Sequence, residues 1–116
     1  MRDLLRVFKA LSDETRLRIL NVLLKRECCV CEVMQALNIS QSRASRNLGV
    51  LYDAGFLKSK RDGAWTVYSI DEKATNNFLP KLVEIVGEGL KDNPDSVLDL
   101  EWLSTAERVG PGCAEV

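Results

Sequence analysis

The chain has 116 residues, of which 46% are apolar, and a formal net charge of −1. This length suits one small domain with a hydrophobic core, and a core of this size is often completed by a partner subunit. No apolar run approaches the roughly 20 residues that span a bilayer, and Arg2, Asp3 and Arg6 interrupt any signal-like stretch at the N-terminus. We therefore expect a soluble, cytoplasmic protein with no membrane partner.

The first part of the chain predicts two helices, at residues 3–11 and 13–26. Either Ser12 or Asp13 can cap the second helix, because a side-chain oxygen there accepts a hydrogen bond from the first turn. Leucine and isoleucine recur at spacings of three and four residues in the second helix, which gives it one broad apolar face. This helix is expected to lie in the core.

A helix-turn-helix pattern follows. The spacing predicts a short helix at residues 30–37, a turn at 38–40 and a longer helix at 41–54. Ser40 is a suitable N-cap for the longer helix, and Gly55 can end it in the left-handed conformation. Two short helices joined in this way form the helix-turn-helix unit, whose second helix reads the major groove of DNA.

The second helix of this unit is expected to have one buried and one exposed face. The residues expected to point inward are Ala44, Leu48 and Leu51. The N-terminal part of such a helix meets base edges, so its outward polar side chains are candidate DNA contacts. These candidates are Gln41, Ser42, Arg43, Ser45, Arg46 and Asn47.

A β-hairpin is predicted directly after this unit. Residues 56–60 and 65–70 are rich in β-forming side chains, and they flank Asp62-Gly63, a strong signal for a hairpin turn. A helix-turn-helix followed by a hairpin is a winged helix, in which the wing lies along the DNA backbone. The fold class is therefore predicted as mostly α with a β-hairpin wing.

Positive charge is concentrated in the middle of the chain. Residues 40–70 carry five Lys/Arg and two Asp/Glu, whereas residues 71–116 carry four Lys/Arg and ten Asp/Glu. Cations on a DNA-binding face displace condensed counterions, although the same charges also suit an ordinary solvated surface. With a wing predicted, phosphate contact is the favoured interpretation for Lys58, Lys60 and Arg61.

The last third of the chain predicts more helix. A long helix is expected from about residue 72 to residue 90, and Pro80 marks either a kink in it or its true start. Its apolar stripe suits a core or a dimer interface, and an interface is favoured in so short a chain. Residues 91–109 predict a further helix before a flexible tail. We therefore expect a DNA-binding and dimerisation domain at residues 1–92 and a C-terminal helix and tail at residues 93–116.

Three of the four cysteines fall within four residues, Cys28-Cys29-Val30-Cys31, at the start of the helix-turn-helix. In a reducing compartment such a cluster suits metal binding or redox chemistry better than a structural disulfide. Soft thiolates select soft ions, and a helix dipole lowers the pKa of a thiol at the helix N-terminus. The candidate metal ligands are Cys28, Cys29, Cys31 and Cys113. Two competing interpretations remain. The cysteines are buried small apolar side chains, or Cys28 or Cys29 forms a redox pair with Cys113.

The spacing of Cys29 and Cys31 poses a geometric problem. Residues two apart in an α-helix point about 200° away from each other around the axis. One ion therefore cannot meet both thiolates unless the first turn unwinds. We hypothesise that ligation distorts this turn and misplaces the DNA-reading residues 41–47, because a ligand shifts a population by its differential affinity for the two shapes.

Four sequence blocks carry a resemblance to a known family. They are FKALSDETRLRIL at residues 8–20, CVCE at 29–32, SQSRASRNL at 40–48 and LYDAGFL at 51–57. Together they resemble the ArsR family of metal- and metalloid-sensing winged-helix repressors. The resemblance implies a homodimer that binds operator DNA in its own promoter region and leaves it when the inducer binds. It also implies a dimer interface built from the first and last helices, at about residues 3–11 and 73–90.

The arsenic-responsive branch of that family is similar to this chain in a further respect. It carries a Cys-Val-Cys pair at the start of the first helix of the unit, matched here by Cys29-Val30-Cys31. Its third cysteine comes three residues later, where this chain has Met34, so the third ligand is either Cys28 or Cys113. The resemblance implies As(III) or Sb(III) as an inducer, with no cofactor. Cd(II) or Pb(II) on the same cysteines stays open, whereas a chain without histidine does not suit the zinc-type site of other branches.

The sequence does not favour an enzyme. It has no histidine for acid-base work, no Gly-rich phosphate loop and no Gly-x-Ser-x-Gly motif. Cys28 and Cys31 have the Cys-x-x-Cys spacing of an oxidoreductase, but they are expected between helices rather than after a strand. The predicted function is therefore a DNA-binding repressor that As(III) or Sb(III) releases from its operator, with a thiol redox-sensing repressor of the same fold as the alternative.

Overall fold

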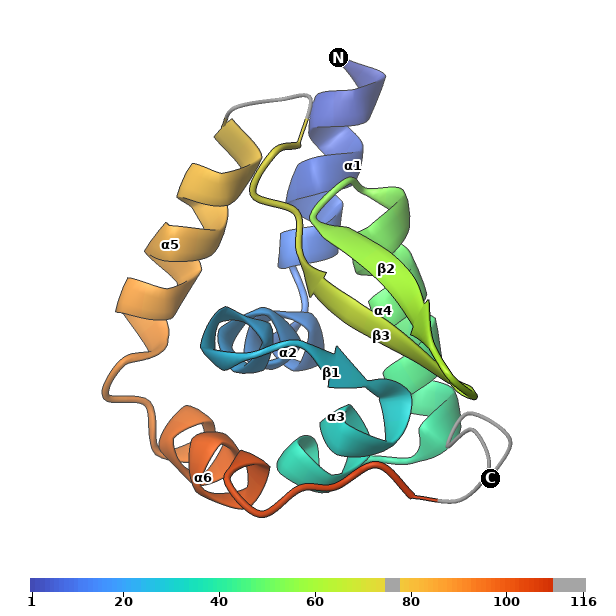
Figure 1. The fold of residues 1–116 in the computed structure, drawn as a ribbon. Coiled ribbons are helices and arrows are strands. Elements are labelled where there is room, and N and C mark those ends of the chain that lie inside the picture. Colours follow the sequence, from blue (N-terminus) through green and yellow to red (C-terminus); the bar gives the residue numbers. More distant parts are fainter. Residues whose placement is uncertain (75–77, 110–116) are drawn as a thin grey trace.

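Helices surround a small sheet in the part of the chain that the computed structural model describes, residues 1–74 and 78–109 (Figure 1). The winged helix-turn-helix prediction is confirmed, with two helices added after the wing. The elements, in chain order, are α1 (Arg2–Leu11), α2 (Glu14–Lys25), β1 (Cys28–Cys29), α3 (Val30–Leu37), α4 (Gln41–Asp53), β2 (Leu57–Asp62), β3 (Trp65–Ile70), α5 (Phe78–Leu90) and α6 (Pro94–Leu103).

Local contacts set where the helices of the DNA-binding unit begin and end. Asp13 caps α2 and Ser40 caps α4, each with a side-chain oxygen that accepts a backbone N–H from the first turn. Asn38 follows α3 with a φ of 55°, a left-handed conformation that asparagine tolerates. Gly55 takes a φ of 95° after α4, as the sequence predicts. These residues fix the turn between α3 and α4 and the exit toward the wing.

The core lies between α2, the helix-turn-helix and the sheet. The inward face predicted for α4 is confirmed, because Ala44, Leu48 and Leu51 are fully buried. Ile19 and Leu20 of α2 pack in the same cluster. The helix-turn-helix is therefore held in place mainly by apolar side chains.

The wing consists of β2 and β3, paired antiparallel from Leu57 opposite Ile70 to Asp62 opposite Trp65. Gly63, with a φ of 62°, opens the two-residue turn between them. The sequence did not predict a third strand, yet β1 pairs with β3 and gives the strand order β1-β3-β2. The cysteine cluster is thereby tied directly to the wing sheet.

After the wing, α5 packs along α2 on one side of the molecule (Figure 1). The predicted start of α5 near residue 72 is wrong: residues 72–73 form a turn, and the helix begins at Phe78. Pro80 therefore lies in the first turn, where its missing N–H costs no intrahelical bond. The helix predicted within residues 91–109 is confirmed as α6, which packs on α3 and α2.

Candidate thiol site and nucleic-acid interface

Cys29 and Cys31 form a thiol pair at the start of α3. Cys29 is the N-cap residue, with an extended backbone at φ −82° and ψ 174°, while Cys31 lies in the first turn. This conformation brings the two Sγ atoms to 2.8 Å from each other. The expectation that the helix must unwind for both sulfurs to meet one ion is therefore wrong, because Cys29 precedes the helix and does not follow its 100° periodicity. Both side chains are buried, with 0% and 3% exposure.

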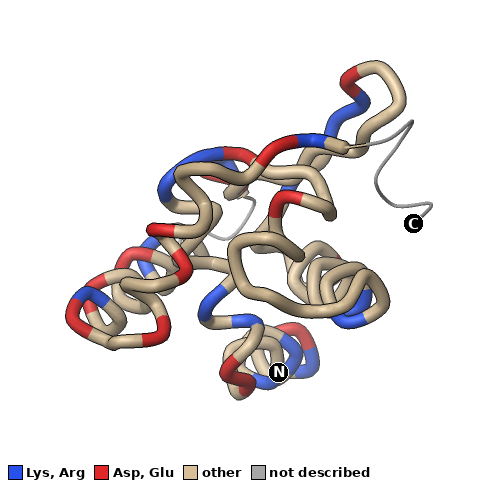
Figure 2. Tube along the Cα trace, turned by 90° about the horizontal axis from the view of Figure 1, so that it is seen from below, with Lys and Arg blue, Asp and Glu red and all other residues tan. Residues whose placement is uncertain are grey.

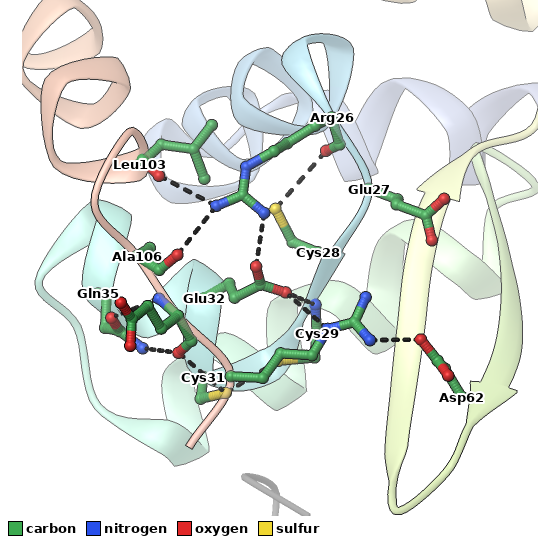
Figure 3. A network of polar contacts seen from close by, with 12 residues as sticks. Arg26, Glu27, Cys28, Cys29, Cys31, Glu32, Gln35, Asp62, Leu103 and Ala106 are labelled. Atoms are coloured by element: carbon green, nitrogen blue, oxygen red, sulfur yellow. Dashed lines mark hydrogen bonds and ion pairs between the residues drawn. The ribbon is translucent and has the colours of Figure 1, made fainter.

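Cys28 takes a different direction from the thiol pair. It precedes Cys29 in β1, and successive residues of a strand point to opposite faces. Its Sγ lies 3.5 Å from the backbone carbonyl oxygen of Arg26 (Figure 3). Burial, with a further contribution from nearby Glu32, raises the pKa of the Cys28 thiol to about 12. The described residues contain no group of three His, Cys, Asp or Glu side chains placed to hold a metal ion. The structure thus unites two of the four predicted ligands, and Cys113 lies outside the described residues.

Glu32 is a buried carboxylate beside the thiol pair that the sequence patterns did not indicate. It accepts the backbone N–H of Cys29 at 2.9 Å and forms an ion pair with Arg26. Burial alone would raise the pKa of Glu32, but these hydrogen bonds lower it below its usual value. Arg26 also donates to the carbonyl oxygens of Leu103 and Ala106. The signal that could have found Glu32 is its place three residues after the N-cap, the spacing of a capping box.

The segment after α6, residues 104–109, runs across α3 and is called the C-terminal strap below (Figure 3). Gln35 fixes it by two hydrogen bonds, since its amide nitrogen donates to the Glu107 carbonyl at 2.6 Å and its amide oxygen accepts the Glu107 N–H at 3.1 Å. The same carbonyl lies 3.9 Å from the Sγ of Cys31. The strap therefore contacts the thiol pair directly.

Arg108 joins the strap to two separate parts of the protein. Its Nε lies 3.4 Å from an oxygen of Glu32, and its Nη1 forms an ion pair with Asp62 at the end of β2. Its guanidinium also lies over the ring of Trp65 in β3, 5.9 Å from the ring centroid. The hydrogen bond to Asp62 raises the pKa of Arg108 further. Sequence patterns gave no signal for this residue, because its partners are far away in the chain.

Part of the polar face predicted for α4 is exposed. Ser42, Arg43 and Arg46 are exposed, whereas Gln41 and Ser45 are half-buried and share a hydrogen bond of 2.9 Å. Arg43 also donates a hydrogen bond to the hydroxyl of Thr15, at the start of α2. The exposed side chains at the start of α4 therefore remain suited to reach into a groove.

Asn47 does not face outward as predicted. It is 5% exposed, its amide oxygen accepts a hydrogen bond from Arg16 at 3.0 Å, and its amide nitrogen donates to the backbone carbonyl of Arg43. The reason is helical geometry: Asn47 precedes Leu48 and follows Ala44 by three positions, which places it at the margin of the buried face. Asn47 ties α4 to α2 and is not placed to contact DNA.

The wing presents the predicted cations to solvent. Lys58, Lys60 and Arg61 are all exposed on β2, and Figure 2 shows basic residues along this hairpin with an acidic residue at its tip. Lys60 forms an ion pair of 3.2 Å with Glu27, and Arg61 makes long contacts within the hairpin. Such solvated pairs contribute little to stability.

Comparison with known proteins agrees with this architecture. A model of the bacterial regulatory proteins of the arsR family matches residues 13–59, from the cap of α2 into β2. The chain is 48% identical over 91 residues to the arsenic resistance transcriptional regulator ArsR2 of Pseudomonas putida, an alignment that covers 75% of this chain and 79% of that protein. This chain belongs to the ArsR family. Its ArsR-family relatives also include the arsenic resistance transcriptional regulator ArsR1 of P. putida, 38% identical over 90% of this chain and 77% of that protein.

Solved structures lead to the same family. The homodimeric winged helix-turn-helix DNA-binding domain Mb0332 of Mycobacterium bovis, described as a possible ArsR-family regulator, has a TM-score of 0.65 and 27% identity over 80% of this chain and 82% of that chain. The fold and the relatives are those of DNA-binding regulators, not of enzymes. The protein is therefore an ArsR-family transcriptional repressor. No helix in its described residues is long and apolar enough to cross a membrane.

Proposed function

We propose that this ArsR-family repressor leaves its operator when As(III) or Sb(III) binds the thiol pair of Cys29 and Cys31. The observation that carries the proposal is the 2.8 Å separation of the two sulfurs at the first turn of the helix-turn-helix. Soft thiolates are the ligands that soft ions prefer. The family relatives named for arsenic resistance support this choice of inducer.

Ligation changes the pair without unwinding α3. The two sulfurs are already neighbours, so one ion can bind both of them while the helix stays intact. Ligation therefore replaces the direct contact between the sulfurs of Cys29 and Cys31 by bonds to the ion, which changes the position of both side chains. Cys29 is the N-cap of α3, and its backbone N–H is held by Glu32. Its displacement disturbs the cap and the start of the helix on which the recognition helix α4 rests.

A third thiolate completes a pyramidal site for As(III), and Cys113 is our candidate for it. Cys28 is disfavoured, because its Sγ is directed toward the backbone carbonyl oxygen of Arg26 and away from the pair. The strap is fixed beside Cys31 at Glu107, and Cys113 follows six residues later in the sequence. Six residues of extended chain span at most about 20 Å, so the thiol pair is within reach.

The DNA-contacting surface of the proposal consists of the start of α4 and the wing. The side chains proposed to meet base edges or phosphates on α4 are Gln41, Ser42, Arg43, Ser45 and Arg46. Lys58, Lys60 and Arg61 of the wing supply phosphate contacts. Asn47 is proposed to position α4 instead, since it holds Arg16 and the backbone of Arg43.

The DNA-binding form is proposed to be a homodimer. Along α1, Leu4, Leu5 and Phe8 are large apolar side chains that are 40–52% exposed. On α5, Phe78 is 38% and Ile85 61% exposed. Apolar side chains gathered on two helices mark an association surface, and two copies of the recognition helix fit two half-sites of an operator. The ArsR-family domain Mb0332 is described as homodimeric, which supports this assembly.

Operator binding under titration tests the proposal. Reduced full-length protein is bound to fluorescent DNA from its own promoter region, and arsenite, antimonite, Cd(II), Pb(II) and hydrogen peroxide are added in parallel. Release by arsenite or antimonite near protein-stoichiometric concentration is the expected result. Release by Cd(II) or Pb(II) alone would identify that metal as the inducer in place of As(III) or Sb(III). Release by peroxide alone would identify the protein as a redox sensor. Cys113→Ser should weaken the response to arsenite if Cys113 is the third ligand, and an unchanged response would remove it from the site.

A further inference from the structure

The buried position of the thiol pair restricts access to it. Cys29 is 0% and Cys31 3% exposed, so no dissolved ion reaches their sulfurs while the surrounding chain stays in place. Glu107, in the strap, has its carbonyl 3.9 Å from the Sγ of Cys31. Of the described segments next to the pair, the strap has no regular secondary structure. A segment held by side-chain contacts, without the backbone hydrogen-bond pattern of a helix or a strand, opens more readily than those elements.

The strap is held at one end by α3 and at the other by the wing. Gln35 of α3 binds Glu107 through both amide atoms. The next residue, Arg108, binds Glu32 beside the thiol pair and Asp62 at the tip of β2, and lies over Trp65 of β3. Movement of the strap away from Cys31 therefore pulls on the contacts of Arg108 with the wing.

Asp62 gives this connection an electrostatic consequence. It is the acidic residue at the end of a strand that otherwise presents Lys58, Lys60 and Arg61. A carboxylate at the wing tip repels the phosphates that these cations attract, and Arg108 offsets its charge while the strap is in place. Loss of Arg108 from this position exposes the negative charge of Asp62 to the DNA backbone.

We propose that Arg108 couples the thiol pair to the wing: the closed strap buries the pair and neutralises Asp62, and the open strap admits the inducer and weakens the hold of the wing on DNA. The inference rests on the proposed function for the role of wing and thiol pair. Coupling of this kind acts equally in both directions, so DNA on the wing also favours the closed strap. Arg108 acts through the strap and the wing as a positioning residue.

Alkylation of the full-length protein, without any inducer, tests the closed strap. The rates at which iodoacetamide labels Cys29 and Cys31 are measured by peptide mapping in Arg108→Gln, Asp62→Asn and Glu27→Gln. The first two variants break the contact between strap and wing and should label about fivefold faster than the parent protein, the effect of one partly exposed ion pair. Glu27→Gln is the matched control, because it removes a wing ion pair, with Lys60, that does not involve the strap. Unchanged labelling in Asp62→Asn would overturn the proposal.

Operator affinity at low salt supplies a readout that a merely structural role would not give. Arg108→Gln and Asp62→Asn break the same ion pair, yet Arg108→Gln should weaken DNA binding about threefold while Asp62→Asn should keep or strengthen it. The double variant should behave as Asp62→Asn does. Equal losses in both single variants would overturn the coupling. Failure of arsenite to release the operator would refute the proposed inducer instead, and the labelling and affinity results would still decide the role of Arg108.

Discussion

The starts of α3 and α4, the two helices of the DNA-binding unit, lie in opposite surroundings. The start of α3 holds Cys29 and Cys31 in the interior, beside Glu32 and beneath the C-terminal strap. The start of α4 presents Ser42 and Arg46 to solvent. A buried, preorganised thiol pair suits a small ion and excludes a macromolecule, whereas an exposed polar helix start suits the major groove. On the proposed function, one supersecondary unit holds the sensor at the start of one helix and the DNA reader at the start of the next.

The position of these two sites explains how a small ion could govern a large complex. The first turn of α3 contacts the sheet through β1, and α3 packs directly on α4. Interiors are close-packed, so a displacement at the cap is transmitted to its neighbours. Removal of a single side chain at one of the two sites should change either the arsenite response or the operator affinity, but not both.

The largest effect is expected from the thiol pair itself. Cys31→Ser should abolish release by arsenite while operator affinity stays close to that of the parent protein, because a serine hydroxyl is a poor ligand for a soft ion. The loss should exceed the roughly 10–100-fold that follows removal of an outer-shell partner of a metal site. Fluorescence anisotropy with arsenite titration measures it. Cys28→Ala is the control and should keep the response; a lost response there would return Cys28 to the ligand set.

A large loss of stability is expected where α6 anchors the sensing side of the unit. The carboxylate of Asp99, 3% exposed, accepts two hydrogen bonds from Arg18 of α2, at 2.7 and 2.8 Å. Asp99→Ala leaves the guanidinium without this partner and should lower the free energy of unfolding by about 2 kcal/mol. Urea unfolding followed by circular dichroism measures it. Glu101→Ala, on the exposed side of α6, should change the free energy by less than about 0.5 kcal/mol.

A smaller and more specific effect is expected on the reading side. Arg46→Ala should weaken operator binding about tenfold and leave the arsenite response intact. If Arg46 meets a phosphate, the slope of affinity against salt should fall by about one charge, and all sequences should lose affinity alike. If it meets a guanine, the loss should vanish when that base pair is changed. An equal loss in Lys25→Ala, at the exposed end of α2, would show that net charge alone is responsible.

The smallest effect is expected from the pKa of Cys28. Burial raises this pKa to about 12 from its ordinary value of 9.0, so above pH 9 the folded protein keeps a proton that the unfolded chain releases. Stability should therefore be unaffected by this group below pH 9 and should fall above it, with a slope of at most about 1.4 kcal/mol per pH unit. Urea unfolding at about pH 8 and about pH 10 should show a smaller alkaline loss in Cys28→Ala than in the parent protein. An equal loss in both would contradict the raised pKa.

Most of the fold was predictable from the sequence, because local signals specify it. The caps at Asp13 and Ser40, the apolar spacing of α4 and the turn at Gly63 all depend on residues near one another in the chain. The start of α5 was misplaced because residues 72–74 have good helix propensity, although the apolar stripe of the helix begins only at Phe78. The two-residue strand β1 was missed because it exists only through its pairing with β3, which lies about 40 residues away.

The candidate site was less predictable, since its geometry depends on a helix boundary and on distant partners. The cysteines were recognised as a cluster, but their relation changes completely with the residue at which α3 begins. With Cys29 as the N-cap the sulfurs meet, whereas one turn of helix around both would separate them. The helical spacing predicted that Asn47 faces outward. In the structure its side chain is buried and accepts a hydrogen bond from Arg16. Arg108 reaches Glu32 and Asp62 from the other end of the chain, beyond any local pattern.

The most direct test of the account combines sensing and reading in one sample. The protein bound to operator DNA is titrated with arsenite, and at each point DNA release is measured while the four cysteines are alkylated and quantified by peptide mapping. We predict that Cys29 and Cys31 become protected by arsenite in step with DNA release, and that the low reactivity of Cys28 does not change. Release of DNA with no protection of Cys29 and Cys31 would contradict the claim that this thiol pair is the sensor.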